Sequence, residues 1–588
     1  MEKSAILHRP DSEYAYLYQE GEFHIRLRTK KDDVTTAFLI SGDPYLFGED
    51  QWYQEQQPMT LLASTEIHDY WQIVVEAPYR RLQYAFSLVG KDQETVFYGD
   101  RGSFEDTKEV REVAGYYFRM PYFHEIDRFK APDWVKKTIW YQIFPERFAN
   151  GDPSITPVGA LAWGSKEHPD TTDFYGGDLQ GIIDHLDHLT ELGINGLYLC
   201  PIFKASSNHK YDTIDYFEID PAFGSKETFK ELVDKAHQRG IKVMLDAVFN
   251  HAGDKSPLWQ DVLKNGKQSK YVDWFHIHSF PVAIGENGNF EGARTVSYDT
   301  FAFTPHMPKL NTANPEVQDY LLGIAAYWIK EFDIDAWRLD VANEVDHHFW
   351  KKFYQATTAL KKDFYILGEI WHSSQSWLQG DEFHGVMNYA YTETIEDFFI
   401  KKSIAPTKMV SGLNEQLMLY RQQTNEVMFN MLDSHDTARL LTICNGDKEL
   451  AKATLAFTFL QHGSPCIYYG TEIGLDGAND PDCRKCMIWD KDKQDLTLFE
   501  FTKKLIQLRK EHQALLSFGS LEWHLIEENE KVVGFRRTAN DETIVAYFNQ
   551  GDAAYTVNDH GTLLMEQAAE LIDEKWHLKQ NGFVILKK

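Results

Sequence analysis

The sequence predicts an α/β protein: a (β/α)8 (TIM) barrel with an insertion subdomain after strand 3, flanked by an N-terminal β-sandwich and a C-terminal antiparallel β domain. Between residues 139 and 469, eight short apolar runs alternate with segments of helical period. On either side of this region, apolar residues recur at every second position, which is typical of antiparallel strands. At ~150 residues per domain, the 588 residues leave room for about four domains.

Residues 1–123 are predicted to form the N-terminal β-sandwich. Alternating runs at 14–18 and 23–28 are separated from later runs by turn signals such as Gly42-Asp43-Pro44. Residues 506–588 are predicted to form the C-terminal β domain, because alternation returns at 531–536 and 543–548.

Residues 124–505 are predicted to form the barrel. Its eight strands are expected at 139–144, 195–199, 242–246, 335–339, 364–367, 386–389, 427–432 and 465–469. Asp246 and Asp340 are 94 residues apart, whereas a simple strand–helix–strand unit takes ~30 residues. We therefore expect the insertion subdomain at 252–306, beside the barrel mouth.

Composition narrows the classes of partner. The chain has 60 Lys and Arg against 89 Asp and Glu, a formal net charge of −29. This charge repels phosphate backbones and anionic lipid, so we expect neither nucleic acid nor a membrane as partner. The N-terminus does not resemble a signal peptide and no segment nears the roughly 20 apolar residues of a membrane span, so we expect a cytoplasmic location. Five cysteines in so long a chain favour reduced thiols over a disulfide framework.

Polar residues follow four predicted barrel strands, at the rim where this fold gathers catalytic groups. They are Asp246 to His251, Arg338 and Asp340, Glu369, and His435 with Asp436. Asp340 and Glu369 are one strand–helix unit apart, and Asp436 follows about two units later, so the three carboxyl groups are expected to converge.

Converging carboxyl groups favour glycoside hydrolysis, which needs a nucleophile and a proton donor beside an oxocarbenium-like transition state. Arg338 shares a strand face with Asp340 and would keep it ionised, as a nucleophile requires. Glu369, beside Trp371, suits the proton donor. A separation of ~5–5.5 Å between these two carboxyl groups would give a retaining mechanism.

Each residue also has a simpler interpretation. A single Asp at a strand end is often a helix cap or a salt-bridge partner, and His251 and His435 could be hydrogen-bonded rim residues rather than donors to sugar hydroxyls.

Four segments carry a resemblance to a known family. They are 246–251 (Asp-Ala-Val-Phe-Asn-His), 337–344 (Trp-Arg-Leu-Asp-Val-Ala-Asn-Glu), 368–371 (Gly-Glu-Ile-Trp) and 432–437 (Leu-Asp-Ser-His-Asp-Thr). In this order they resemble the four conserved regions of the α-amylase family of glycoside hydrolases (family 13). Segment 307–311 (Met-Pro-Lys-Leu-Asn) resembles the marker of the neopullulanase, cyclomaltodextrinase and maltogenic amylase subgroup.

The resemblance implies a role for each site residue. Asp340 would be the nucleophile, Glu369 the acid/base, and Asp436 the residue that holds the sugar hydroxyls at the cleavage site. The residues implied around the substrate are Arg338, His251, His435, Tyr211, Asp246, Asp480 and Arg484. Glu344 resembles a position that influences whether water or a sugar accepts the glycosyl group, or else it forms a plain surface salt bridge.

The resemblance also implies a homodimer formed through the N-terminal domain, in which one module narrows the partner's cleft. Tyr45 and Trp52 could contribute to this, although the favoured interpretation of each is a buried sandwich aromatic. Phe301 and Phe303 could face a cyclodextrin ring or belong to the core of the insertion.

The resemblance also raises the question whether the chain binds a structural calcium ion. Asn150, Asp152, Gly176 and Asp178 match ligand positions, but Ile155-Thr156 replaces two oxygen ligands of the relatives, and calcium needs six to eight oxygens. No cofactor is otherwise expected. His276-x-His278 is interpreted as structural, and Cys483-x-x-Cys486 as two free thiols.

The sequence therefore predicts a retaining hydrolase of α-1,4-glucosidic bonds in cyclodextrins, maltooligosaccharides and pullulan, with transglycosylation. The expected products are chiefly maltose, and panose from pullulan. Three alternatives stay open at this point: an α-1,6-oligosaccharide hydrolase or exo-acting α-glucosidase, a non-catalytic glucan-binding protein, and a barrel metallohydrolase.

Overall fold

The computed structural model describes residues 1–282 and 296–588, so residues 283–295 of the predicted insertion lie outside the described residues. The chain forms two compact units. One combines Met1–Lys130 with Glu393–Asn425 and Glu522–Phe535, and the other combines Ala131–Thr392 with Glu426–Leu521 and Arg536–Lys588. Among the helices of the described part of the chain, none is long and apolar enough to cross a membrane.

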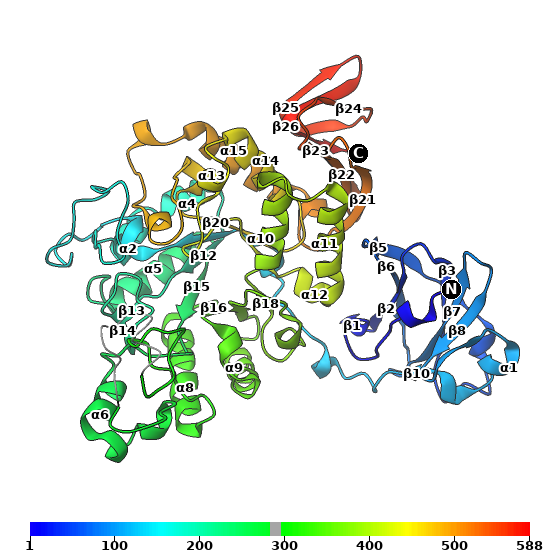
Figure 1. Cartoon of the computed structure of the whole chain (residues 1–588), viewed down its shortest axis with the longest axis horizontal. Coiled ribbons are helices and arrows are strands. Elements are labelled where there is room, and N and C mark those ends of the chain that lie inside the picture. Colours follow the sequence, from blue (N-terminus) through cyan, green and yellow to red (C-terminus); the bar gives the residue numbers. More distant parts are fainter. Residues whose placement is uncertain (283–295) are drawn as a thin grey trace. The chain divides into compact units, whose positions relative to one another are not determined.

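The N-terminal module is a sandwich of two antiparallel sheets (Figure 1). The first has the order β1-β2-β6-β5 and the second β4-β3-β7-β8-β9, with β10 beside β7. Alternation fixes the inner faces, because Phe23, Ile25 and Leu27 of β2 are all buried. The strands are β1 (Ala15–Gln19), β2 (Glu22–Lys30), β3 (Val34–Gly42), β4 (Gln57–Pro58), β5 (Thr60–Ser64), β6 (His68–Glu76), β7 (Gln83–Gly90), β8 (Thr95–Gly99), β9 (Gly102–Glu105) and β10 (Phe118–Arg119).

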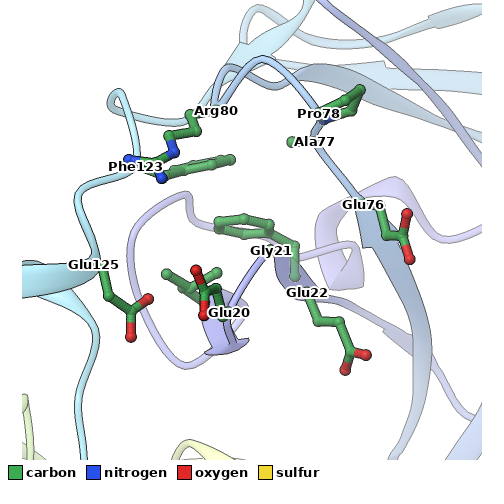
Figure 2. Close-up of a pocket in the computed structure, with 11 residues that line it drawn as sticks. Glu20, Gly21, Glu22, Glu76, Ala77, Pro78, Arg80, Phe123 and Glu125 are labelled. Carbon is green, nitrogen blue, oxygen red and sulfur yellow. The ribbon is translucent and has the colours of Figure 1, made fainter.

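A cavity of about 390 Å³ lies in this module. Its wall includes the Phe123 ring, which stacks on Phe23 with 3.6 Å between the ring centroids. Figure 2 shows Glu22 and Glu76 on one side of it and Arg80 beside Phe123. Four glutamates and one arginine line the cavity, which therefore repels anions.

Eight parallel strands form the predicted barrel, in the order β18-β17-β16-β15-β12-β11-β20-β19. A parallel bridge from Met387 to Phe429 joins the two ends of this order. Inward side chains such as Trp140, Tyr198, Met244 and Leu367 fill the interior, so the barrel is a packed core. The strands are β11 (Trp140–Ile143), β12 (Gly196–Leu199), β15 (Lys242–Ala247), β16 (Ala336–Leu339), β17 (Tyr365–Gly368), β18 (Gly385–Val386), β19 (Phe429–Asn430) and β20 (Ser464–Tyr468).

Helices follow the barrel strands (Figure 1), and several of them begin at a side chain that caps the first turn. Ser225, Asp346 and Asp447 accept backbone N–H groups at the first turns of α5, α9 and α14. The longer helices of this unit are α5 (Lys226–Gln238), α8 (Pro315–Phe332), α9 (His347–Leu360), α14 (Lys448–Phe459) and α15 (Leu496–Glu511). The remaining ones are α2 (Pro145–Phe148), α3 (Leu179–Asp184), α4 (Leu186–Leu192), α6 (Pro257–Asn265) and α13 (Leu440–Ile443).

Two local features differ from the sequence prediction. A small hairpin, β13 (Phe203–Ala205) and β14 (Thr213–Ile219), follows β12, and Tyr211 lies in its loop. In the described part of the insertion, helix α6 packs Trp259 against Phe275 and Tyr298.

The C-terminal sheet begins later than predicted. Residue 506 lies inside α15, whose buried Leu505, Ile506 and Leu508 give a helical rather than an alternating pattern. The sheet has the order β21-β22-β23-β26-β24, with β25 paired to β26. Its strands are β21 (Ser520–Glu527), β22 (Val532–Ala539), β23 (Glu542–Asn549), β24 (Tyr555–Val557), β25 (Thr562–Ile572) and β26 (Lys575–Lys587).

Candidate active site

The barrel register brings three predicted carboxyl groups to one guanidinium. Asp246 of β15 pairs with Arg338 of β16, and the ladder continues past the strands, since Asp340 N–H donates to Ala247 O and Glu369 N–H to Leu339 O. The buried Arg338 Nη1 donates to both oxygens of Asp246 at 3.0 Å and to Asp340 Oδ1 at 2.8 Å. Its Nη2 lies 2.8 Å from Glu369 Oε2.

One buried cation therefore faces three carboxyl groups. Burial raises the pKa of Asp340 well above its ordinary value and that of Asp246 to about 6, against the lowering effect of Arg338. The negative charge of Glu369 adds to both increases. Such a cluster titrates as a set. Burial opposes the ionised form of Asp340 that a nucleophile requires, and Arg338 favours that form.

Glu369 is fixed on both carboxyl oxygens. Trp371 Nε1 donates to Oε1 at 3.0 Å, and the backbone N–H of Val341 donates to Oε2 at 3.1 Å. The Trp371 ring stacks on Tyr389 at 3.7 Å, so its orientation is fixed while 47% of the residue stays exposed. These contacts hold the carboxyl group that the sequence predicts to be the proton donor.

Val341 has φ 45° and ψ 43°, a left-handed conformation that is rare for a β-branched residue. Such a conformation costs about 1–3 kcal/mol and persists where the surroundings impose it. Here it turns the Val341 N–H toward Glu369, immediately after the nucleophile candidate Asp340.

A chain of hydrogen bonds links His435 to the carboxyl cluster. Gln142 Nε2 donates to His435 Nδ1 at 2.7 Å, which places the ring proton on Nε2. Nε2 lies 2.6 Å from the Tyr211 hydroxyl, which donates to Asp246 at 3.0 Å. Burial lowers the pKa of His435 well below its ordinary value, so the ring is neutral.

His251 is also a neutral donor. Its Nε2 lies 3.2 Å from the backbone oxygen of Tyr211, and burial lowers the pKa of its imidazole to about 3. Its ring stacks on Phe301 with 5.0 Å between centroids. Phe301 therefore lies at the cleft, whereas Phe303 is 48% exposed.

Asp436 and the predicted residues near the other end of the cleft form a second charged group. Arg484 Nη2 donates to Asp436 Oδ1 at 3.3 Å, and its Nη1 lies 3.0 Å from Asp480. Arg484 Nε also donates to the backbone oxygen of His435 at 2.9 Å. Asp436 retains an exposed carboxyl edge, which can accept hydrogen bonds from sugar hydroxyls.

Asp340, Glu369 and Asp436 line one cavity of about 430 Å³. Besides predicted residues, the cavity is lined by His209, Met307, Val341 and Asn343, which the sequence reasoning did not assign to the site. Asn343 and Val341 lie inside the 337–344 segment that carries the family resemblance, so the sequence could have placed them beside Asp340. His209 lies in the unpredicted β13–β14 loop, and its position could not be read from strand spacing.

Four predicted substrate residues lie outside that lining: Arg338 and His435, which are almost fully buried, and Asp246 and Glu344. Asp246 is fully enclosed beneath Arg338 and bonded by Tyr198 and Tyr211. Glu344 forms an ion pair with Lys309 at 3.4 Å, as the simpler interpretation predicted, and its carboxyl group stays 42% exposed.

The predicted calcium residues come together in a hydrogen-bonded loop. Asp178 accepts N–H bonds from Gly151, Asp152 and Gly181, acting as the N-cap of α3. Asp152 accepts from Ser154, and Asn150 Nδ2 donates to Thr156 Oγ1 at 2.8 Å.

Two observations on the loop around Asn150 and Asp178 argue against a calcium ion: the space at Gly176 is filled, and the carboxylates are already hydrogen-bonded. A Cβ at Gly176, where φ is +81°, would lie 2.6 Å from Thr156, so the loop is already filled. Asn150 Oδ1 is buried with no hydrogen-bond partner among the described residues, but the carboxylates beside it are engaged. The residues present do not fit a calcium ion, which needs six to eight oxygens.

The remaining motifs have structural roles. Cys483 and Cys486 are buried and unpaired with each other, and burial raises the pKa of each thiol to about 12. His278 forms an ion pair with Asp299 at 2.6 Å. Over residues 1–282 and 296–588, no group of three or more His, Cys, Asp or Glu could hold a metal ion.

The two module aromatics differ. Trp52 donates to Asp43 O and packs on Phe47 and Tyr117, as a sandwich aromatic does. Tyr45 is 78% exposed, so its interpretation as a buried aromatic is wrong.

Comparison with known proteins identifies the family of the chain. The model of the α-amylase catalytic domain matches residues 142–517, and the model of the α-amylase N-terminal ig-like domain matches residues 1–124. An intracellular maltogenic amylase of Bacillus subtilis (strain 168) is 56% identical over 558 residues, covering 95% of this chain and 93% of the relative. Neopullulanase 2 of Thermoactinomyces vulgaris is 43% identical over 554 residues, covering 94% of this chain and 92% of the relative.

A solved structure of a cyclomaltodextrinase is 46% identical, with a TM-score of 0.92 and full coverage of both chains. The chain belongs to the α-amylase family of glycoside hydrolases, with a catalytic barrel and an N-terminal ig-like domain.

Proposed function

We propose that the protein is a retaining hydrolase of α-1,4-glucosidic bonds in cyclodextrins, maltooligosaccharides and pullulan. It releases mainly maltose, and panose from pullulan, and also transfers glycosyl groups to sugars. The observation that carries the proposal is the meeting of Asp340, Glu369 and Asp246 at the buried Arg338, with Asp340 and Glu369 lining the cleft. Relatives named maltogenic amylase, neopullulanase and cyclomaltodextrinase support the substrate class.

In the first step, Asp340 attacks the anomeric carbon as Glu369 delivers its proton to the glycosidic oxygen. The C1–O bond breaks, the leaving sugar departs with a hydroxyl group, and a glycosyl ester forms on Asp340. Arg338 stabilises the ionised Asp340 through Nη1. Trp371 and Val341 hold Glu369 in position.

In the second step, Glu369 removes a proton from the acceptor, whose oxygen attacks C1 and releases Asp340. Water as acceptor gives hydrolysis, and a sugar hydroxyl gives transfer. Because the ester is open to any hydroxyl that reaches it, the acceptor side of the cleft sets the ratio of these products.

The sugar that is cleaved lies beside Asp436, whose carboxylate accepts its hydroxyls. The neutral His251 and His435 hold Tyr211 in place through its backbone oxygen and its hydroxyl group, and the Tyr211 ring packs on the apolar face of the sugar. Asp480 and Arg484 hold the next sugar toward the non-reducing end. This placement is supported by the contact of Arg484 with both Asp436 and Asp480.

We further propose that the enzyme is cytoplasmic and forms a homodimer through its N-terminal domain, so that one module narrows the partner's cleft. The word "intracellular" in the name of the Bacillus subtilis relative supports the location. The ig-like domain match supports the module's identity. Sedimentation analysis of the full chain and of a chain lacking residues 1–123 tests the dimer.

No cofactor is needed in this scheme, because the proton donor and nucleophile are both side chains of the chain itself. Calcium is not proposed as a structural ion, since the hydrogen bonds of Asp152 and Asp178 already engage their carboxylates.

The product profile from β-cyclodextrin, pullulan and soluble starch, measured in parallel, tests the proposal. Fast cyclodextrin opening to maltose, panose from pullulan and slow attack on starch are expected. Glucose release from chain ends, with cyclodextrin untouched, would instead indicate an exo-acting glucosidase.

A further inference from the structure

The side chain of Lys309 joins three segments around the cleft. Its Nζ donates to Asn250 Oδ1 and to the backbone oxygen of Glu344 at 2.9 Å, and lies 3.4 Å from Glu344 Oε2. Lys309 itself lies in the segment that returns from the insertion, where it forms a bridge with His251. Its side chain is only 20% exposed. The ammonium group is therefore a fixed crosslink rather than a mobile surface charge.

The segment it holds is the turn from Val341 to Glu344, which follows the nucleophile directly. At its first residue, Val341 N–H donates to Glu369 Oε2 at 3.1 Å, and Ala342 N–H donates to Glu369 O at 3.2 Å. At its last residue, Glu344 is held by Lys309. The left-handed Val341 makes the turn depend on these contacts at both ends.

The turn borders the path of the acceptor. Val341 and Asn343 line the cavity, and Val341 contacts the Glu369 oxygen that faces Arg338. Glu369 protonates the leaving oxygen, and by microscopic reversibility it deprotonates the acceptor at the same place. The Val341–Glu344 turn, which lies beside this oxygen, therefore limits the space available to an acceptor sugar.

We propose that Lys309 is a positioning residue that holds the Val341–Glu344 turn and thereby sets the partition of the glycosyl intermediate between a sugar acceptor and water. The inference rests on the proposed function, because it concerns the second step of that reaction. Lys309 acts through Glu344 and the turn, and it contacts no reacting atom.

Lys309→Met tests the proposal, with Lys361→Met as the matched control. Lys361 has a similar exposure of 18% and also binds a carboxylate and backbone oxygens, those of Asp333, Ile334 and Asp335. These partners precede strand β16, at the opposite end from Asp340. Both variants remove a crosslinking ammonium group, but only one lies beside the acceptor path.

Three quantities are measured for each folded variant: the ratio of transfer to hydrolysis with excess maltose as acceptor, the KM for the acceptor, and the pre-steady-state rate of glycosylation by an aryl α-maltoside. For Lys309→Met we expect a transfer ratio at least fivefold lower and a raised acceptor KM. The rate of glycosylation by the aryl α-maltoside should stay within about threefold of wild type, because an aryl leaving group does not have to fit the sugar site beside the Val341–Glu344 turn. Lys361→Met should leave the ratio unchanged.

Conservative and double variants show whether the effect runs through Glu344. Lys309→Arg should restore at least half of the ratio, and Lys309→Met with Glu344→Gln should differ little from Lys309→Met alone, because coupled residues are not additive. An unchanged ratio in Lys309→Met, or an equal fall in Lys361→Met, would overturn the proposal. A wild-type protein that cleaves no α-1,4-glucan would instead refute the proposed function itself.

Discussion

Replacing Arg338 by lysine keeps the charge but not the geometry. Arg338 is fully buried and reaches Asp246 and Asp340 through Nη1 and Glu369 through Nη2. A lysine presents three donors on one nitrogen and cannot reproduce a fork that serves three carboxyl groups. We therefore expect at least two of these contacts to be lost in Arg338→Lys.

The magnitude follows from those contacts. Hydrogen bonds to charged groups contribute about 1.5–3 kcal/mol each, so the loss of two costs about 3–6 kcal/mol. At ~1.4 kcal/mol per factor of ten, this corresponds to a fall in kcat/KM of about 10²- to 10⁴-fold where the loss is felt in the transition state. The assay is the initial rate of β-cyclodextrin opening, with circular dichroism to confirm folding.

Arg509→Lys is the matched control. Arg509 is also buried, but it donates to backbone oxygens such as those of Gln461 and Gly463 rather than to carboxylates. It should lower the melting temperature and leave kcat/KM within about threefold. A folded Arg338→Lys enzyme with kcat/KM within tenfold of wild type would refute the role given to Arg338.

Three further predictions follow from the site and its surroundings. Asp340→Asn should lower kcat at least about a thousandfold while glucan still binds, because the amide cannot form the glycosyl ester; rate assays and calorimetric binding measure this. Asp246→Asn should flatten the dependence of unfolding free energy on pH, measured by urea denaturation from pH 3.5 to 7. Burial raises the pKa of Asp246 to about 6, so its contribution to wild-type stability is full below pH 3.8 and is lost as the pH rises through about 6. Thr156→Val should lower the melting temperature, because Asn150 Nδ2 loses its acceptor, whereas added calcium or a chelator should leave the wild-type melting temperature unchanged.

Each of these predictions has an outcome that contradicts it. Substantial turnover by Asp340→Asn, with contamination by wild type excluded, would refute the nucleophile assignment. An Asp246→Asn curve parallel to wild type from pH 3.8 to 6 would mean that the folded Asp246 has an ordinary pKa. A rise of several degrees in melting temperature with calcium would show that the loop around Asn150 binds the ion after all.

The barrel could be predicted because its strands carry their own signal. Runs such as 243–245 and 364–367 are continuous, apolar and buried, and the spacing of the strands matches the repeat of strand and helix. Asp246, Arg338 and Asp340 followed from this, because register and alternation place them at one rim. Asp340, Glu369 and Asp436, the three carboxyl groups that were expected to converge, line one cavity.

Other features depend on contacts that no local pattern reports. The hairpin that places Tyr211 and His209 is held by Asp212, which accepts backbone N–H bonds from Ser206 and Ser207. The predicted start of the C-terminal domain at residue 506 is too early, because the alternation that indicated it lies at 531–536 and 543–548, whereas α15 continues to Glu511. The left-handed Val341 is likewise invisible in sequence, since most β-branched residues avoid that conformation.

Lys309 shows a different limit. It was noticed only as part of the 307–311 marker, and its contact with Glu344 spans 35 residues of sequence. A lysine in a loop predicts nothing about its partner, so only the folded chain shows what it crosslinks.

Trapping the glycosyl intermediate tests the central claim most directly. A fluorinated maltosyl fluoride, which forms the ester faster than it is hydrolysed, is incubated with the full-length enzyme, and the labelled peptide is identified by mass spectrometry. The mechanism predicts one maltosyl group on Asp340, with the first-formed product of normal turnover keeping the α configuration in proton magnetic resonance spectra. A label on Glu369 or Asp436, or a first product of β configuration, would contradict it.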